Sequence, residues 1–281
     1  MDAPIQSPEP NSQSKTLCIG VSDSGVGGLS VLRSLRAQLP NAPLLYVADS
    51  GYAPYGERSN EYVIDRSRRI LDHLVAEGAV GVVIACNTAT AIAARELRLS
   101  RPEIPIVGVE PGLKPAAITT RNGRIGVMAT PATIASEKFR VLMQAQGSGV
   151  TITPRSCPGL ARLIEEGDLN SSQLREAIDG HTTHLRAAGV DTVVLGCTHY
   201  AFVRHHIEAA MGHGVQIIDT ADAVARHAVN TLGPLLPAAE ATDTMRLQTT
   251  GDADRLRAIA SAWLPFLCSV ESISTAAETL P

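Results

Sequence analysis

Short apolar runs alternate with longer stretches of helical periodicity from residue 16 onward. Each run is bounded by glycine, proline or polar residues, a pattern typical of buried β-strands. Fully apolar strands separated by helices are characteristic of a parallel sheet covered on both faces, so the pattern predicts an α/β fold. The predicted strands are residues 16–22, 43–48, 80–85, 104–109, 124–129, 191–196 and 215–218.

The clearest helical pattern covers residues 61–77. Gly78 follows it, and glycine is the residue most typical of a position just beyond a helix. We therefore expect one amphipathic helix that packs on the sheet and ends near residue 77. The apolar side chains of its buried face are Val63, Ile64, Ile70, Leu71, Leu74 and Val75.

The chain also repeats its own pattern. "IGVSDSG" begins at Ile19 and "IGVMATP" begins at Ile125, an offset of 106 residues. "VVIACNTA" and "VVLGCTHY" place Cys86 and Cys197 at an offset of 111 residues. Two similar offsets predict two related α/β lobes, and chance similarity between apolar strands is the alternative.

These offsets suggest where the lobes begin and end. We expect the first lobe to hold residues 16–115 together with about 220–281, and the second lobe to hold residues 116–219. The chain would change lobes near "VEPGLKP" (109–115). Residues 1–15 are rich in proline, serine, glutamine and asparagine, which predicts a disordered tail.

Composition narrows the class of protein. Hydrophobic residues make up 44% and charged residues 19% of the 281, as in soluble globular proteins. The net charge is −4, aromatic residues make up 3%, and the one basic cluster, Arg66, Arg68 and Arg69, is assigned to a solvated helix face. No nucleic-acid partner is therefore expected. No membrane association is expected either, because no apolar run reaches the roughly 18–20 residues of a membrane helix.

The cysteines and the N-terminus indicate the compartment. The N-terminus lacks the charged and apolar regions of a signal peptide. The five cysteines are odd in number and widely spread, at positions 18, 86, 157, 197 and 268. Such spacing does not form a disulfide framework, so we expect a reducing, cytoplasmic location.

Polar clusters follow three of the predicted strands. Ligands of open α/β sheets bind beyond the carboxyl ends of the strands, where these clusters fall. If the two lobes face each other, two thiols would flank one cleft from opposite sides. The clusters are Asp23-Ser24-Gly25 with Gly27 and Gly28, Cys86-Asn87-Thr88, and Cys197-Thr198-His199.

Two thiols in such positions suit acid/base chemistry. At a helix N-terminus the pKa of a cysteine, about 8.5, is expected to fall by one or more units. His199 and Asp23 could relay protons to the thiols. Inversion of a carbon centre without a cofactor needs two such groups, one to remove the α-proton and one to return a proton from the far face. One group must be a thiolate and the other a thiol.

Each element of this hypothesis has a purely structural alternative. A lone cysteine at a strand end is more often a small buried hydrophobe, and Cys18, Cys157 and Cys268 are assigned to packing. Asp23 could instead cap the following helix. A phosphatase-type nucleophile is disfavoured, because Gly25 stands where such loops carry a second acid.

The nearby glycines do not have the spacing of a common phosphate-binding loop. They suit a tight turn whose backbone N–H groups approach a carboxylate. His181 and His184 lie one helical turn apart, but no third ligand accompanies them. We assign them, and likewise His205 and His206, to solvated helix faces, and we expect no metal.

Lysine usage bears on the cofactor. The sequence has only three lysines, Lys15, Lys114 and Lys138, and a pyridoxal enzyme needs a Schiff-base lysine in its pocket. Lys15 lies in the tail and Lys138 lies in a helical pattern. Nothing around Lys114 suggests a phosphate site, so chemistry without a cofactor is favoured.

Taken in order, several stretches resemble the glutamate racemases of the aspartate/glutamate racemase superfamily. The likeness runs from about residue 16 to residue 235, and "DSGVGG" together with "PYGERS" favours glutamate racemases over their relatives. The stretches are "IGVSDSGVGGLSVLR" (19–33), "VADSGYAPYGERS" (47–59), "ACNTATA" (85–91), "VGVEPG" (107–112), "GVMATPATIAS" (126–136), "CPGLARLIEEG" (157–167) and "LGCTHY" (195–200).

The resemblance implies two pseudo-symmetric lobes with the active site in the cleft between them, and a two-base mechanism without a cofactor. Cys86 would deprotonate D-glutamate, and Cys197 would deprotonate L-glutamate. Asp23 would assist the first thiol. His199 would lie beside the second thiol, and Glu165 would support this histidine.

The resemblance also implies the substrate-binding residues. Their hydroxyl, amide and backbone groups can hold two carboxylates and an ammonium without an arginine clamp. A homodimer and a role in supplying D-glutamate for peptidoglycan follow from the resemblance alone. The implied residues are Ser24, Pro54, Tyr55, Gly56, Asn87, Thr88 and Thr198, with Thr130 and Thr133 as a further polar turn of the second lobe.

Three positions depart from the family pattern: Ser22, Phe139 and Ala201. None removes a chemical group from the implied mechanism. Three alternatives remain open: a relative that acts on aspartate or another α-substituted acid, a binding or regulatory protein without turnover, and an α/β ligand-binding protein whose cysteines are core residues. The tail matches no regulatory extension, so no regulation is inferred.

Overall fold

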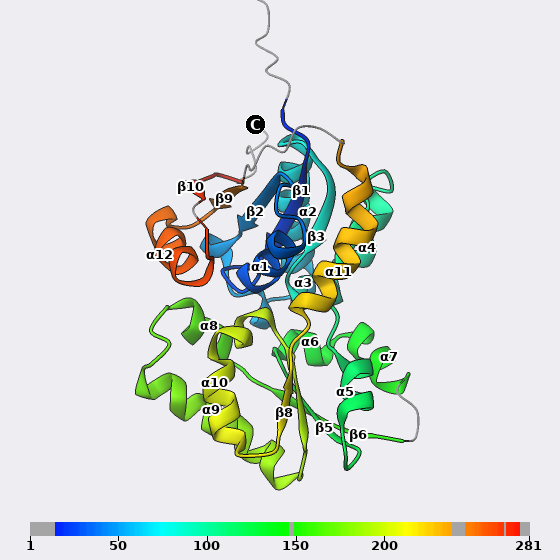
Figure 1. The fold of residues 1–281 in the computed structure, drawn as a ribbon, viewed down its shortest axis with the longest axis vertical. Coiled ribbons are helices and arrows are strands. Elements are labelled where there is room, and N and C mark those ends of the chain that lie inside the picture. The colour runs from blue at the N-terminus through cyan, green and yellow to red at the C-terminus, as the bar shows by residue number, and fades with distance from the viewer. Residues whose placement is uncertain (1–14, 146–148, 238–244, 267, 276–281) are drawn as a thin grey trace, which may run out of the picture.

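The computed structural model describes residues 15–145, 149–237, 245–266 and 268–275. Apart from Lys15, the predicted tail therefore lies outside the described residues. The ammonium of Lys15 donates a hydrogen bond to Glu77 Oε1 at 2.9 Å. Figure 1 shows two lobes stacked along the long axis of the molecule. No helix in the described ranges is long and apolar enough to cross a membrane.

The first lobe is built on a six-stranded sheet with the strand order β10-β9-β2-β1-β3-β4. Every pairing in it is parallel, and β1 and β2 are buried along nearly their whole length. This burial follows from the apolar runs that predict these strands. The strands are β1 (Cys18–Asp23), β2 (Leu44–Ala48), β3 (Ala79–Ile84), β4 (Ile106–Gly108), β9 (Met245–Thr249) and β10 (Ser269–Ser272).

Helices cover both faces of this sheet, with a separate hydrophobic cluster under each layer. On one face lie α1 (Leu29–Gln38), α11 (Ala221–Leu232) and α12 (Ala253–Trp263); on the other lie α2 (Asn60–Ala76), α3 (Asn87–Ile92) and α4 (Ala94–Ser100). Short 3-10 turns complete the lobe: η1 (Ser50–Tyr52), η2 (Tyr55–Glu57) and η4 (Gly233–Leu235).

The second lobe repeats the plan on a four-stranded parallel sheet with the order β6-β5-β7-β8. Its strands are β5 (Arg124–Ala129), β6 (Thr151–Ser156), β7 (Thr192–Gly196) and β8 (Gln216–Ile218). Its helices are α5 (Leu113–Thr119), α6 (Pro131–Ala135), α7 (Glu137–Gln144), α8 (Leu160–Glu165), α9 (Ser172–Ala187) and α10 (Arg204–Met211), with the 3-10 turn η3 (Thr198–Val203).

All seven predicted strands are present, and the predicted α/β class is confirmed. The helix predicted at 61–77 is α2, which begins after Ser59. The Ser59 hydroxyl accepts a hydrogen bond from the Tyr62 N–H at 3.3 Å and so caps the helix. The helix gives way to Gly78, whose φ of 98° lies in the left-handed region.

Three strands were not predicted: β6, β9 and β10. β6 lies at a sheet edge, carries Pro154 and Arg155, and is half-buried at most positions, so its sequence has no apolar run. β9 is largely buried, but it alternates apolar residues with Arg246 and Gln248.

Two surface assignments are wrong. Arg66 is buried, because its guanidinium pairs with the buried Asp49 at 2.8 Å and lies 3.4 Å over the ring of Tyr52. His181 is also buried, since α9 turns this residue toward β6, where its Nδ1 lies 3.3 Å from Arg155 Nη2. Burial lowers the pKa of His181.

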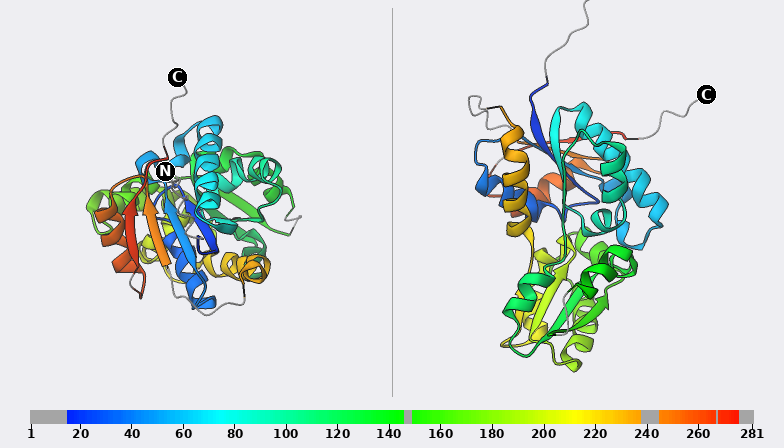
Figure 2. Two further views of the ribbon diagram at one scale, coloured as in Figure 1. Left: turned by 90° about the horizontal axis from the view of Figure 1, so that it is seen from above. Right: turned by 90° about the vertical axis from the view of Figure 1, so that its right-hand side faces the viewer.

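The chain crosses between the lobes twice, after β4 and after β8. A Cβ atom on Gly112 would lie 3.0 Å from Thr220 Cγ2 and 3.1 Å from Ile218 Cγ2, so the two crossings run side by side. In Figure 2 (right) the crossings join the lobes at one side of the molecule. The second lobe is thus an insertion between β4 and α11 of the first.

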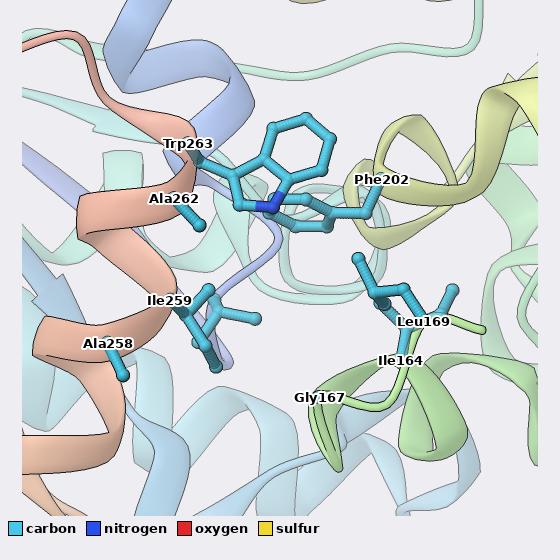
Figure 3. Close-up of a pocket in the computed structure, with 9 residues that line it drawn as sticks. Ile164, Gly167, Leu169, Phe202, Ala258, Ile259, Ala262 and Trp263 are labelled. Atoms are coloured by element: carbon cyan, nitrogen blue, oxygen red, sulfur yellow. The ribbon is translucent and has the colours of Figure 1, made fainter. Parts of the chain in front are cut away.

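A second contact between the lobes involves α12. The Trp263 ring meets Phe202 of the second lobe edge to face, with the ring centroids 4.1 Å apart. Beside this pair lies an apolar pocket of about 230 Å³, with Ile259 of α12 on one side and Ile164 and Leu169 on the other (Figure 3). Val26, in the loop after β1, also lines this pocket. The two lobes therefore leave a gap in their packing next to this loop.

Candidate active site

The carboxyl ends of three strands bring the predicted polar clusters into the cleft between the lobes. β1 ends at Asp23, β3 leads into Cys86, and β7 leads into Cys197. All three side chains are buried, at 3%, 5% and 7% exposure. The turn after β1 contacts both cysteine clusters: Ser24 Oγ lies 3.6 Å from Cys86 Sγ, and a Cβ atom at Gly27 would lie 2.7 Å from Thr198 Oγ1.

Cys86 is the N-cap residue of α3. Its sulfur accepts a hydrogen bond from the Ala89 N–H at 3.4 Å and donates one to Ser24 Oγ at 3.6 Å. Burial, and then the negative charge of Asp23, raises the pKa of the Cys86 thiol to about 12. The expected fall in pKa is therefore wrong for this cysteine, because desolvation outweighs the helix N–H groups.

Asp23 is fixed by the turn that follows it. Its Oδ1 accepts a hydrogen bond from the Ser24 N–H at 2.6 Å, and its Oδ2 accepts one from the Gly28 N–H. Burial raises the pKa of Asp23 to about 6, against the opposing charge of His199. Asp23 therefore holds the turn before α1 and also keeps a carboxyl group that titrates near neutral pH.

The second thiol belongs to a chain of three side chains. His199 Nδ1 lies 3.8 Å from Cys197 Sγ, and His199 Nε2 lies 2.6 Å from Glu165 Oε2. Burial alone would lower the pKa of His199, but its hydrogen bonds with Cys197 and Glu165 raise it well above the usual value. Burial would raise the pKa of Glu165, but the bond from His199 holds it below its usual value. An imidazolium thus faces the second thiol.

Glu165 ends α8 in the second lobe, yet groups of the first lobe hold it. The Val26 N–H donates to its Oε2 at 3.1 Å, and the Ser50 hydroxyl donates to its Oε1 at 3.0 Å. The Arg255 guanidinium donates to its backbone carbonyl. Hydrogen bonds from the first lobe therefore hold the Glu165 carboxylate across the cleft.

The glycines after Asp23 are required by this close approach. A Cβ atom at Gly25 would lie 2.3 Å from Glu165 Oε2, and one at Gly27 would lie 2.5 Å from His199 Nδ1. Sequence reasoning predicted a turn whose N–H groups approach a carboxylate. The structure identifies a carboxylate of the chain itself, that of Glu165.

Polar groups from both lobes line the rest of the site. Thr88 Oγ1 lies 2.9 Å from Thr130 Oγ1 and 3.3 Å from Thr133 Oγ1, so a hydroxyl cluster spans the cleft. The Nδ2 of Asn87 is buried and has no hydrogen-bond partner within the described part of the chain. Thr198 is buried close to Gly27. An unpaired donor beside hydroxyl groups indicates a site for a polar ligand.

The segment Pro54–Tyr55–Gly56 lies against the second lobe. A Cβ atom at Gly56 would lie 2.7 Å from Thr130 Cβ. The Tyr55 hydroxyl donates to Asp49, which also pairs with Arg66. The backbone of this segment, rather than the Tyr55 hydroxyl, is therefore available to a ligand.

Sequence reasoning missed Ser50, Asp49 and Arg255. Ser50 and Asp49 lie within the stretch "VADSGYAPYGERS", but nothing in the sequence pattern indicates a chemical role for them. Arg255 lies beyond the region of resemblance. No sequence signal links any of them to Glu165 or Tyr55, since these contacts join residues from separate elements.

Comparisons with known proteins show which family the chain is similar to. A family model described as Asp/Glu/Hydantoin racemase matches residues 27–228. The glutamate racemase of Ectopseudomonas mendocina is 48% identical over 86% of this chain and 92% of its own length. That of Pseudomonas aeruginosa is 49% identical over 75% of this chain and 80% of its own.

Solved structures give the same result. Glutamate racemase isoform RacE1 from Bacillus anthracis superposes with a TM-score of 0.83 at 31% identity, covering 92% of this chain and 98% of that one. Escherichia coli glutamate racemase, in complex with L-glutamate and the activator UDP-MurNAc-Ala, has a TM-score of 0.82 at 27% identity, with the same coverage.

The chain belongs to the Asp/Glu/Hydantoin racemase family, and it is a racemase. The relatives just named are all glutamate racemases, which confirms the resemblance that the sequence motifs predicted.

Proposed function

We propose that this enzyme interconverts L-glutamate and D-glutamate without a cofactor, by moving protons between the α-carbon and two cysteines. One observation carries the proposal: Cys86 and Cys197 are buried and come from different lobes, and the turn at residues 23–28 contacts Cys86 through Ser24 and approaches His199, the neighbour of Cys197, through Gly27. The relatives at 48–49% identity are named glutamate racemases, which supports glutamate as the substrate.

In the direction from L to D, the Cys197 thiolate removes the α-proton and the Cys86 thiol delivers a proton to the opposite face. The pKa of about 12 keeps Cys86 protonated at neutral pH, as a donor must be. The imidazolium of His199 stabilises the charge on Cys197. In the reverse direction Asp23 is placed to assist removal of the proton from Cys86.

Substrate binding is assigned to uncharged groups. The unpaired Asn87 amide and the threonine hydroxyls at the cleft can bind carboxylate oxygens, since both are neutral donors. These donors come from both lobes, so a bound acid would link them. The proposed binding residues are Ser24, Pro54, Tyr55, Gly56, Asn87, Thr88 and Thr198, with Thr130 and Thr133.

Solvent deuterium incorporation tests the reaction. The purified enzyme is incubated with L-glutamate in D2O, with a chelator and without pyridoxal phosphate. We expect D-glutamate that carries deuterium at the α-carbon. L-Aspartate, tested in parallel, separates this function from that of an aspartate-specific relative. If folded, reduced protein exchanges neither acid, the proposal fails in favour of a binding protein.

The two-thiol mechanism has its own test. Cys86→Ser and Cys197→Ser should each lower racemisation in both directions by about a hundredfold to ten-thousandfold, because a serine hydroxyl is a far weaker acid than a thiol. Circular dichroism should show native folding for both variants. Undiminished turnover in either variant would reject the mechanism.

We also propose the use of the product, the location of the enzyme, its oligomeric state and its lobe boundaries. The product D-glutamate would supply peptidoglycan synthesis in the cytoplasm, and the enzyme would act as a homodimer, which light scattering can test. We propose residues 16–115 with about 220–281, and residues 116–219, as the two lobes; α5 of the second lobe begins three residues before this boundary, at Leu113. The pairing of β9 with β2 supports assigning the last segment to the first lobe.

A further inference from the structure

We propose that Ser50 is a positioning residue for the racemase reaction. Its hydroxyl, on the first lobe, would hold the carboxylate of Glu165 on the second lobe, and would thereby fix His199 against Cys197. This inference rests on the proposed function, since it assigns His199 and Cys197 to the half-reaction that begins from L-glutamate.

The contacts of the Glu165 carboxylate carry the proposal. Oε2 accepts hydrogen bonds from His199 Nε2 at 2.6 Å and from the Val26 N–H at 3.1 Å. Oε1 accepts a hydrogen bond from Ser50 Oγ at 3.0 Å, and no other residue in the described part of the chain donates a hydrogen bond to Oε1. Removal of this hydroxyl would leave one carboxylate oxygen without a donor.

Ser50 is itself held firmly. It opens η1 directly after Asp49, whose N–H donates to the Asp23 carbonyl at 2.9 Å. The Asp49 carboxylate is fully buried and accepts hydrogen bonds from Arg66 and from Thr250 Oγ1 at 2.8 Å. The backbone of Ser50 is therefore fixed at the carboxyl end of the sheet, on the same side as the proposed catalytic groups.

Ser50 acts through His199 and not through the substrate. A carboxylate held at both oxygens cannot rotate about its terminal torsion, so the bond to His199 Nε2 keeps one direction. That direction sets the position of Nδ1, 3.8 Å from Cys197 Sγ. Because Ser50 and Glu165 lie on opposite lobes, the alignment is complete only when the cleft is closed.

The experiment compares Ser50→Ala with Ser50→Thr, which keeps the hydroxyl. The control is Ser261→Ala, which removes a surface hydroxyl on α12 that donates a hydrogen bond to the backbone carbonyl of Arg257. For Ser50→Ala we expect kcat to fall by about tenfold to a hundredfold in both directions, with KM within about twofold of wild type. The kinetic isotope effect of α-deuterated L-glutamate should rise more than that of the D-enantiomer. Ser50→Thr should restore most of the rate, and Ser261→Ala should match wild type.

The pH profile adds a readout that a general loss of stability would not change. Loss of the fixed Glu165 partner should bring the pKa of His199 down from its raised value. The alkaline limb of kcat for L-glutamate should therefore move to lower pH in Ser50→Ala. A wild-type rate and profile in this variant would overturn the proposal. A raised KM at unchanged kcat would also overturn it, because that result marks a substrate contact.

NMR titration of the imidazole signals separates this proposal from the proposed function. The chain has eight histidines, and the signal lost in His199→Gln identifies His199. A lowered pKa of His199 in substrate-free Ser50→Ala supports the positioning role even if the wild-type enzyme fails to racemise glutamate. An unchanged pKa of His199 counts against that role, whatever the activity.

Discussion

At the scale of single residues, the two thiols of this racemase stand in opposite electrical surroundings. Cys86 lies beside the Asp23 carboxyl group, and Cys197 lies beside the His199 imidazole. A negative neighbour favours a protonated thiol, and a positive neighbour favours a thiolate. This asymmetry supports the proposed direction in which an L-substrate gives its α-proton to Cys197 and Cys86 donates a proton.

Asp23 should leave a signature in the pH dependence of stability. Its pKa of about 6 in the folded protein lies above the ordinary value of 3.8, so the folded state binds more protons between these values. The stability contributed by Asp23 is thus complete below pH 4 and is lost as the pH rises through 6. The full effect is at most about 3 kcal/mol.

Urea unfolding of wild type and Asp23→Asn at pH 4 to 7.5 measures this effect. The variant lacks the titrating group, so its free energy of unfolding should rise relative to that of wild type as the pH rises. Only the change with pH is diagnostic, because asparagine also alters the bonds to Ser24 and Gly28. A constant difference across the range would contradict the raised pKa.

A glycine substitution gives a second test at this scale. Gly25→Ala places a Cβ atom 2.3 Å from Glu165 Oε2, so the carboxylate must move. We expect kcat to fall by about a hundredfold while the fold persists. Gly180→Ala is the matched control, since α9 has open space at that position and alanine should stabilise the helix by about 0.5–1 kcal/mol. Equal activity in both variants would show that the loop tolerates displacement.

At the scale of elements, α2 supports the site with a buried ion pair. Arg66 on α2 and Asp49 after β2 hold the turn from which Ser50 and Tyr55 reach their partners. Arg66→Met should leave Asp49 buried and uncompensated, at a cost of about 3–5 kcal/mol in unfolding free energy. Arg68→Met on the same helix breaks only the exposed pair with Glu96 and should cost at most about 1 kcal/mol.

Chemical denaturation of the two variants in parallel measures this difference. A loss below about 1 kcal/mol for Arg66→Met would mean that Asp49 finds other partners or becomes protonated.

The elements also show how far sequence reasoning reaches. Strands with unbroken apolar runs, such as β1 and β7, are predictable because burial on both faces demands such residues. β6 is not predictable in this way because it is a half-buried edge strand. β9 is not predictable because it carries polar side chains. Helix α2 was predictable from its periodicity, but the buried position of Arg66 depends on Asp49, which a distant strand supplies.

Some residues of the candidate site are likewise predictable from the sequence, and others are not. The positions of Asp23 and Cys86 follow from the rule that polar residues at the carboxyl ends of parallel strands meet at one edge of a sheet. Cys197 follows β7 in the other sheet, so it meets them only because the lobes face each other. The role implied for Glu165 came from the family resemblance, and its bond to His199 is visible only in three dimensions. Ser50 and Arg255 reach Glu165 across the cleft, so no local pattern could reveal them.

At the scale of the whole molecule, both thiols are closed off between the lobes. Cys86 and Cys197 are at most 7% exposed, so a substrate must enter through a more open arrangement. Alkylation by iodoacetamide should follow the same route. Saturating glutamate should slow modification of both cysteines by at least about tenfold, because bound ligand favours the closed state.

Mass spectrometry of the modified peptides measures both rates. Cys268 is an internal control, since it is partly exposed and lies outside the cleft, near α12. Its rate should not respond to glutamate. Equal rates for Cys86 with and without ligand would favour the alternative in which the cysteines are simple core residues.

The pairing of β9 with β2 has a consequence for the synthesis of the chain. On the ribosome β2 is complete long before Met245 is made, because the whole second lobe is translated in between. Until then one edge of β2, a strand buried in the finished protein, has no neighbouring strand to pair with its backbone N–H and C=O groups. The nascent enzyme thus presents an open apolar strand through most of its translation, and the cell must keep that edge from pairing with another chain.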